Sequence, residues 1–244
     1  MSEQWEQLQV NGETMRAFVC TPDGPGPHPA MVVIQHAGGV DNFIQDMTRR
    51  SAEAGYTSIA PDLYHREDPN STDDGMTKLG RLQDTNIVAD VNAALAYLRA
   101  NNVANGSIGI IGFCMGGRVA FQMAGQNPDD FKASVPFYGG NTMTRWGSDP
   151  GPTPFDLLKN IKCPVLGFFG EDDPNPSPED MLKIAAELTA NGIPHEFHMY
   201  SQTGHAYMDH TNPNRYVENS AIASWPITVA FLQKTLGRVA AGAR

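Results

Sequence analysis

The chain has 244 residues, a length that one α/β domain can fill and that supplies a core without disulfides or metals. Its formal net charge of −10 is spread along the sequence with no basic stripe, so neither nucleic acid nor an anionic membrane is an expected partner. The three cysteines are widely spaced and the N-terminus is polar and acidic, which favours a reducing, cytoplasmic setting. We therefore expect residues 1–244 to form a single cytoplasmic domain.

The first elements begin an alternation of strand and helix. Asn11-Gly12 predicts a tight hairpin between strands at 5–10 and 14–20. The continuous apolar run at 30–34 is typical of a strand that is buried on both faces of a parallel sheet. Helical spacing follows at 43–54, and a short strand is expected at 56–60.

Residues 61–75 are polar and rich in turn formers, and we expect an excursion over the sheet because the alternation resumes behind them. From Ile87 to Leu98 apolar residues recur at the spacing of an amphipathic helix. This order predicts an α/β fold with a mostly parallel, doubly wound sheet, helices on both faces and an antiparallel N-terminal hairpin. The remaining strands are expected at 108–111, 133–138, 165–169 and 196–200, and the remaining helices at 118–124, 178–190 and 216–236.

Cys114 lies where a strand gives way to a helix, in Gly112-Phe113-Cys114-Met115-Gly116-Gly117. The order strand, G-x-C-x-G, helix is the nucleophile elbow of an α/β-hydrolase with Cys in the usual Ser position. The glycines permit a strained turn and a close approach of strand and helix. Because unpaired N–H groups at a helix N-terminus favour a thiolate, the sequence predicts an activated cysteine.

An acid and a base follow later strands. Gly170-Glu171-Asp172-Asp173 comes after the strand at 165–169, and Gly204-His205 follows the strand at 196–200. The carboxyl ends of parallel strands meet at one edge of a sheet, and the chain order nucleophile, acid, base is that of the α/β-hydrolases. Either Asp172 or Asp173 could orient the histidine.

These motifs, together with Pro61-Asp62-Leu63-Tyr64, give a chain that resembles the dienelactone hydrolase (carboxymethylenebutenolidase) family over nearly its whole length. The resemblance implies a hydrolase of small esters or lactones that needs no cofactor. It also implies the roles of individual residues: Cys114 as nucleophile, Asp173 as acid, His205 as base, and the N–H groups of Ala37 and Met115 as oxyanion donors.

Two positions depart from the family. His36 stands where the best-matching relatives carry a Glu, so we expect either that it favours the Cys114 thiolate or that it only orients its loop. The member that cleaves dienelactone grips the substrate carboxylate with arginines, one of them shortly after the catalytic histidine. This chain has Ala206-Tyr207-Met208-Asp209 there, so Lys78 or Arg81 would have to supply a cation, and dienelactone itself is not assured as the substrate.

The sequence also contains candidate side chains for a substrate pocket and for a metal site. The expected pocket residues are Tyr138, Trp146, Arg81 and Tyr207. His195 and His198 are three residues apart on a strand and point to opposite faces, so no metal site is expected. Cys20 and Cys163 are interpreted as small buried hydrophobic residues.

Two other functions remain open from the sequence. A non-catalytic ligand-binding or redox-sensing module could keep the fold and use the cysteine as a reporter. An acyltransferase on the same scaffold would differ only in which acceptor enters.

Overall fold

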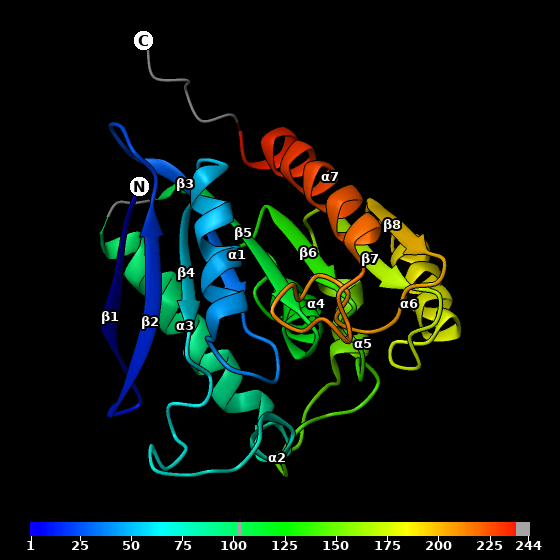
Figure 1. Ribbon diagram of the computed structural model, residues 1–244, viewed down its shortest axis with the longest axis horizontal. Coiled ribbons are helices and arrows are strands. Elements are labelled where there is room, and N and C mark those ends of the chain that lie inside the picture. Colours follow the sequence, from blue (N-terminus) through cyan, green and yellow to red (C-terminus); the bar gives the residue numbers. More distant parts are fainter. Residues whose placement is uncertain (102–103, 238–244) are drawn as a thin grey trace.

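The computed structural model describes residues 1–101 and 104–237, and within them eight strands form one sheet in the order β1-β2-β4-β3-β5-β6-β7-β8 (Figure 1). The hairpin of β1 (Ser2–Val10) and β2 (Glu13–Thr21) is antiparallel, and β2 pairs antiparallel with β4 (Thr57–Pro61). The pairs from β4 through β8 are parallel. The predicted fold class, with its hairpin at the N-terminal edge, is confirmed.

The central strand β3 (His28–Ile34) is buried along its whole length. Because side chains alternate across a strand, Val32 and Ile34 enter the core cluster on one face, while Met31 and Val33 enter the cluster on the other. The sheet continues through β5 (Ala104–Phe113), β6 (Ala133–Phe137), β7 (Val165–Gly170) and β8 (His195–Tyr200).

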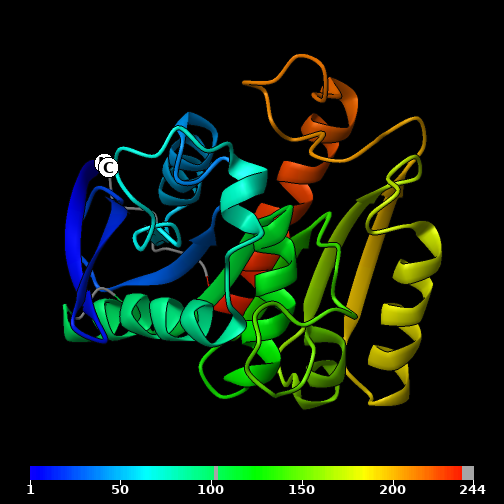
Figure 2. The same ribbon diagram turned by 90° about the horizontal axis from the view of Figure 1, so that it is seen from below.

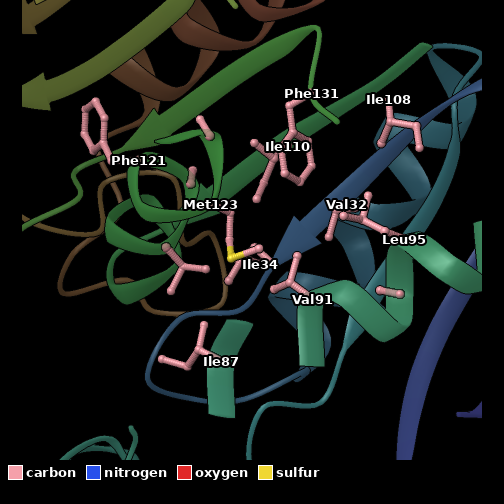
Figure 3. Close-up of a cluster of buried hydrophobic side chains, with 14 of the residues drawn as sticks. Val32, Ile34, Ile87, Val91, Leu95, Ile108, Ile110, Phe121, Met123 and Phe131 are labelled. Atoms are coloured by element: carbon pink, nitrogen blue, oxygen red, sulfur yellow. The ribbon is translucent and has the colours of Figure 1, made fainter. Parts of the chain in front are cut away.

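Helices cover both faces of this sheet (Figure 2). One face packs against α1 (Asn42–Glu53) and α7 (Glu218–Leu236), and the other against α3 (Asp84–Ala100), α4 (Met115–Gln126) and α6 (Pro178–Ala190). Figure 3 shows the core cluster beneath α3, α4 and α6, to which Val91 and Leu95 of α3, Val32 of β3 and Ile110 of β5 belong. This packing fixes the strand ends from which the site is built.

A local signal accounts for the start of α6. Ser177 forms a capping box with Asp180, and Pro178 occupies the first turn of α6, so this helix begins where the sequence predicts. Three short elements were not predicted: α2 (Gly75–Leu79), α5 (Pro154–Leu157) and the 3₁₀ turn Leu158–Asn160. None of the helices in the described ranges is both long enough and apolar enough to cross a membrane.

Candidate active site

The turn from β5 into α4 holds Cys114 in a strained backbone conformation. Its φ of 58° and ψ of −118° lie in a region that L residues rarely adopt. A Cβ added at Gly112 would collide with the carbonyl of Gly116, and one at Gly116 would collide with the carbonyl of Ile34. Only glycine at these two positions lets strand and helix approach closely enough to present the thiol at the edge of the sheet.

Cys114, His205 and Asp173 come together at this edge. His205 follows β8, and its imidazole lies near enough to the Cys114 thiol for each group to shift the pKa of the other. Its Nδ1–H donates to Oδ2 of Asp173, with 2.8 Å between the two atoms, and Asp173 is buried after the end of β7. The neighbouring Asp172 is exposed, so the histidine is bonded to the second carboxylate of the pair.

The thiol and the imidazole each stabilise the charged form of the other. Burial raises the pKa of the Cys114 thiol, but the hydrogen bond and charge of His205 and the backbone N–H groups of Met115 and Ala37 outweigh it, so this pKa lies below its usual value. Burial lowers the pKa of His205, whereas its hydrogen bonds to Asp173 and Cys114 raise it to about 9. The arrangement favours the charged forms of both groups, a thiolate and an imidazolium.

The backbone N–H groups of Ala37 and Met115 lie near the sulfur and lower the pKa of the thiol. Met115 is the first residue of α4, so its N–H is one of the helix's unpaired donors. Ala37 is held by Tyr64, whose hydroxyl lies 3.1 Å from the Ala37 carbonyl oxygen and 3.2 Å from that of Gly75. In the sequence Tyr64 stands out only as part of the Pro61-Asp62-Leu63-Tyr64 motif, and its bonds to this loop and to α2 were not predicted.

The site opens into a cavity of about 810 Å³. Met76, Leu79, Met115 and Trp146 supply its larger apolar side chains. Polar side chains that also line it are Asp74, Asn141, Asn175, Asp209, Asn212, Asn214 and Arg215. A cavity that combines apolar surface with a few polar groups is typical of a site for a small organic molecule.

Of the four side chains expected in the substrate pocket, Trp146 lines this cavity and the other three lie elsewhere. Tyr138 is fully buried behind the triad, with its ring 5.2 Å from that of His205 and 5.3 Å from that of Tyr207. Tyr207 is also buried, and its hydroxyl bonds to Ser224. The backbone of Tyr138 has a positive φ of 39°, so the chain turns just past the strand and the ring packs inward.

Lys78 and Arg81, the two cations expected to bind a substrate carboxylate, also lie outside the cavity. Arg81 is engaged by Glu67 and Asp73 on the surface, and Lys78 lines a separate hollow. Arg215, which sequence reasoning missed, lines the catalytic cavity instead. It lies ten residues after His205, beyond the short stretch that the family pattern draws attention to.

His36 lies at the wall of the cavity but is bonded away from the thiol. Its Nε2 is 2.7 Å from Oδ2 of Asp41, the residue that caps α1 through the N–H of Ile44. Its ring packs edge-on against Phe43. These contacts suit a loop-orienting role, and the predicted influence of His36 on Cys114 stays a prediction.

No group of three or more potential metal-ligating side chains occurs in residues 1–101 and 104–237. His195 bonds to the carbonyl of Ile193, and His198 bonds to Glu196. Cys20 and Cys163 are buried, and burial raises the pKa of each thiol to about 12.

The sheet order, the cysteine elbow and the acid and base at neighbouring strand ends define an α/β-hydrolase. Residues 15–236 match the model of the dienelactone hydrolase family, and the chain belongs to that family. It is therefore a dienelactone hydrolase-like hydrolase.

Individual relatives agree with this assignment. A protein from Escherichia coli (strain K12) named "Putative carboxymethylenebutenolidase" is 33% identical over 224 residues, which cover 89% of this chain and 82% of that protein. "Protein usf" of Aquifex pyrophilus is 28% identical over 240 residues, covering 96% and 99%. The solved structure named "Crystal Structure of Putative Dienelactone Hydrolase from Klebsiella pneumoniae subsp. pneumoniae MGH 78578" superposes with a TM-score of 0.84 at 28% identity, covering 96% of this chain and all of that one.

Proposed function

We propose that this chain cleaves small esters or lactones without a cofactor, through a thioester formed on Cys114. The observation that carries the proposal is the relay from Cys114 through His205 to Asp173, which sits at a strained elbow and opens into a cavity. In this reading Cys114 is the nucleophile, His205 the general acid and base, and Asp173 the group that orients the imidazole.

The reaction then runs in two halves. The Cys114 thiolate attacks the ester carbonyl, a C–S bond forms, and the N–H groups of Ala37 and Met115 stabilise the oxyanion. The intermediate collapses, the C–O bond to the alcohol breaks, and His205 gives that oxygen its proton. A water molecule next loses a proton to His205 and attacks the thioester, which releases the carboxylic acid and restores the thiolate.

The same hydrogen bonds allow His205 to serve both halves. In the free enzyme the Cys114 thiolate helps to raise the His205 pKa to about 9, so the imidazolium is ready to donate a proton. Once the sulfur is acylated it carries no charge, and this contribution to the His205 pKa is lost. The pKa falls, and the neutral imidazole can accept the proton of the attacking water.

The cavity sets limits on the substrate. Asp209 is buried and faces the cavity, its carboxylate held by the N–H and hydroxyl of Thr211, while Arg215 brings an exposed positive charge to the same wall. We propose small esters or lactones of the dienelactone type, with a substrate carboxylate tolerated only where it can reach Arg215. A panel of p-nitrophenyl esters, enol lactones and dienelactone, with and without an acyl-side carboxylate, tests this when run on the native chain and on Arg215→Gln. Equal selectivity in both proteins would exclude the role of Arg215.

Replacement of the nucleophile tests the proposal directly. Cys114→Ala is expected to lower turnover by at least about 10⁴-fold while the protein still folds. Cys163→Ala, a matched control at a buried cysteine outside this cavity, is expected to keep its activity. A Cys114→Ala protein that hydrolyses every ester at the native rate would overturn the proposal.

Intact-mass measurement with an activated ester separates the alternatives. A hydrolase accumulates an acyl adduct on Cys114, and the adduct decays in water. An acyltransferase discharges the same adduct faster when an alcohol or amine acceptor is added. A non-catalytic binding or redox module gives no adduct that turns over.

A further inference from the structure

A fully buried arginine stands four residues after the nucleophile, on the same helix. Arg118 lies in the first turns of α4, and its side chain has no exposed surface. Burying a guanidinium is costly unless every N–H finds an acceptor. Here each of them does, and the hydrolytic steps described above make no use of this group.

The acceptors of Arg118 belong to three parts of the chain. Both terminal nitrogens donate to the carboxylate of Asp84, at 2.7 and 3.1 Å, and Nη1 also donates to Oε1 of Gln122. The remaining two donors go to a loop after β6: Nε to the carbonyl of Asn141 at 3.1 Å, and Nη2 to that of Thr144 at 2.6 Å. The planar fork of an arginine suits this set of acceptors, and a lysine cannot reproduce it.

Asp84 holds the same loop from the start of α3. Its Oδ2 accepts the backbone N–H of Trp146 at 2.9 Å, and its own N–H donates to the Trp146 carbonyl at 3.0 Å. The Arg118 guanidinium lies 3.9 Å from the centre of the Trp146 ring, a cation–π contact. Residues 141–146 form no helix or strand, so the Arg118–Asp84 pair supplies much of the bonding that fixes their path.

This loop forms part of the substrate cavity. Asn141 and Trp146 both line it, together with Cys114 at the start of α4. The helix that presents the nucleophile therefore also carries the group that anchors an apolar wall of the cavity.

We propose that Arg118 is a positioning residue that, with Asp84, fixes Trp146 relative to Cys114 and so sets the preference for esters with an apolar group that packs on the indole. The selectivity part of this inference rests on the proposed hydrolase function. The positioning part does not, because it concerns only where the indole lies.

The kinetic test compares two p-nitrophenyl esters, the hexanoate and the acetate. In Arg118→Lys and in Trp146→Ala the ratio of kcat/KM for hexanoate to that for acetate is expected to fall about tenfold, the loss of a modest apolar contact. The loss appears mainly as a higher KM for hexanoate. Since Arg118 acts through the indole, the double variant is expected to match Trp146→Ala.

A matched control weakens another arginine–aspartate pair outside the cavity, in which the aspartate is buried and the arginine is half-buried. Arg66 donates two 2.9 Å hydrogen bonds to the buried Asp90, also on α3, and does not line the catalytic cavity. Arg66→Lys is expected to leave the ratio unchanged. A ratio that is unchanged in Arg118→Lys, or equal losses on both esters, would overturn the proposal. Should Arg118→Lys fail to fold, Asp84→Asn takes its place in the same comparison.

Tryptophan fluorescence tests the position of Trp146 without requiring that the protein hydrolyse an ester. In a Trp5→Phe, Trp225→Phe background, Trp146 is the single tryptophan, because the chain has three. Arg118→Lys is expected to shift its emission and to increase its quenching by acrylamide, whereas Arg66→Lys leaves both unchanged. An unaltered Trp146 signal in Arg118→Lys would overturn the positioning role. Absence of any ester hydrolysis in the native chain, with the signal altered as expected, would refute only the hydrolase.

Discussion

Gly117→Ala tests whether the close packing of the elbow serves catalysis more than stability. Gly117 is in the first turn of α4, and a Cβ added there would lie 2.5 Å from the carbonyl oxygen of Phe137 and 2.8 Å from Cα of Gly139. Ordinary contact begins at 3.4 Å, so the helix and the end of β6 would have to separate by about 0.9 Å. The nearest atoms are all backbone, which leaves no flexible side chain to give way.

The two expected effects of this substitution differ in size. Overpacking costs about 1–3 kcal/mol, while replacing a helical glycine by alanine returns about 1 kcal/mol, so the net loss of unfolding free energy is about 0–2 kcal/mol. For a chain of this length that lowers Tm by no more than about 8 °C. A shift of about 1 Å next to the nucleophile, in contrast, costs on the order of 100-fold in rate.

The assay is kcat/KM for a p-nitrophenyl ester together with a thermal melt. Gly80→Ala is the matched control, because its φ is −62° and a Cβ there would meet Thr77 at an ordinary 3.4 Å. This control is expected to keep its rate and to gain about 0.4–1 kcal/mol through the unfolded state. If Gly117→Ala hydrolyses the ester at the native rate, the reasoning from close packing is refuted.

Three other outcomes follow from the site. Asp173→Asn removes the carboxylate that accepts the Nδ1 proton of His205, and turnover is expected to fall on the order of 10³–10⁴-fold, with a normal far-ultraviolet spectrum as the control. Because the His205 pKa is raised to about 9, the imidazolium and its stabilising interactions are complete below the ordinary pKa of 6.5 and are lost as pH rises through about 9. Hydrolysis of esters with poor leaving groups should decline over that range, and a rate that keeps climbing past pH 9 contradicts this. His36→Glu is expected to slow alkylation of Cys114 at neutral pH, and equal rates across the pH range would leave His36 with a loop-orienting role alone.

The sheet and its main helices could be predicted because their signals are local. The continuous apolar run at 30–34 predicts the burial of β3, and Ser177-Pro178 marks the start of α6. The helix α2 gives no such signal, since none of its side chains is buried. The start of α5 was detectable, because Thr153 and Asp156 form a capping box with Pro154 in the first turn.

The candidate reacting residues could be predicted from the elbow and the strand ends, whereas most of the side chains that line the cavity could not. Whether a side chain faces the cavity depends on how a loop packs against distant parts of the chain. Tyr138 turns inward because the backbone twists just after β6, and Trp146 faces the cavity because a buried ion pair far away in sequence holds it there. Arg215 reaches the cavity from an irregular loop. Helical or strand periodicity in the sequence does not predict the path of such a loop.

None of the side chains of α2 is fully buried, although Leu79 packs against the core cluster. Met76 of this helix, which is 67% exposed, and Leu79 still line the cavity. Detaching this helix would break the hydrogen bond from Tyr64 to the Gly75 carbonyl but would uncover no fully buried side chain, so α2 is expected to open at a lower cost in free energy than the sheet. Directed evolution confined to these two positions can therefore broaden the range of accepted molecules without a penalty in thermal tolerance.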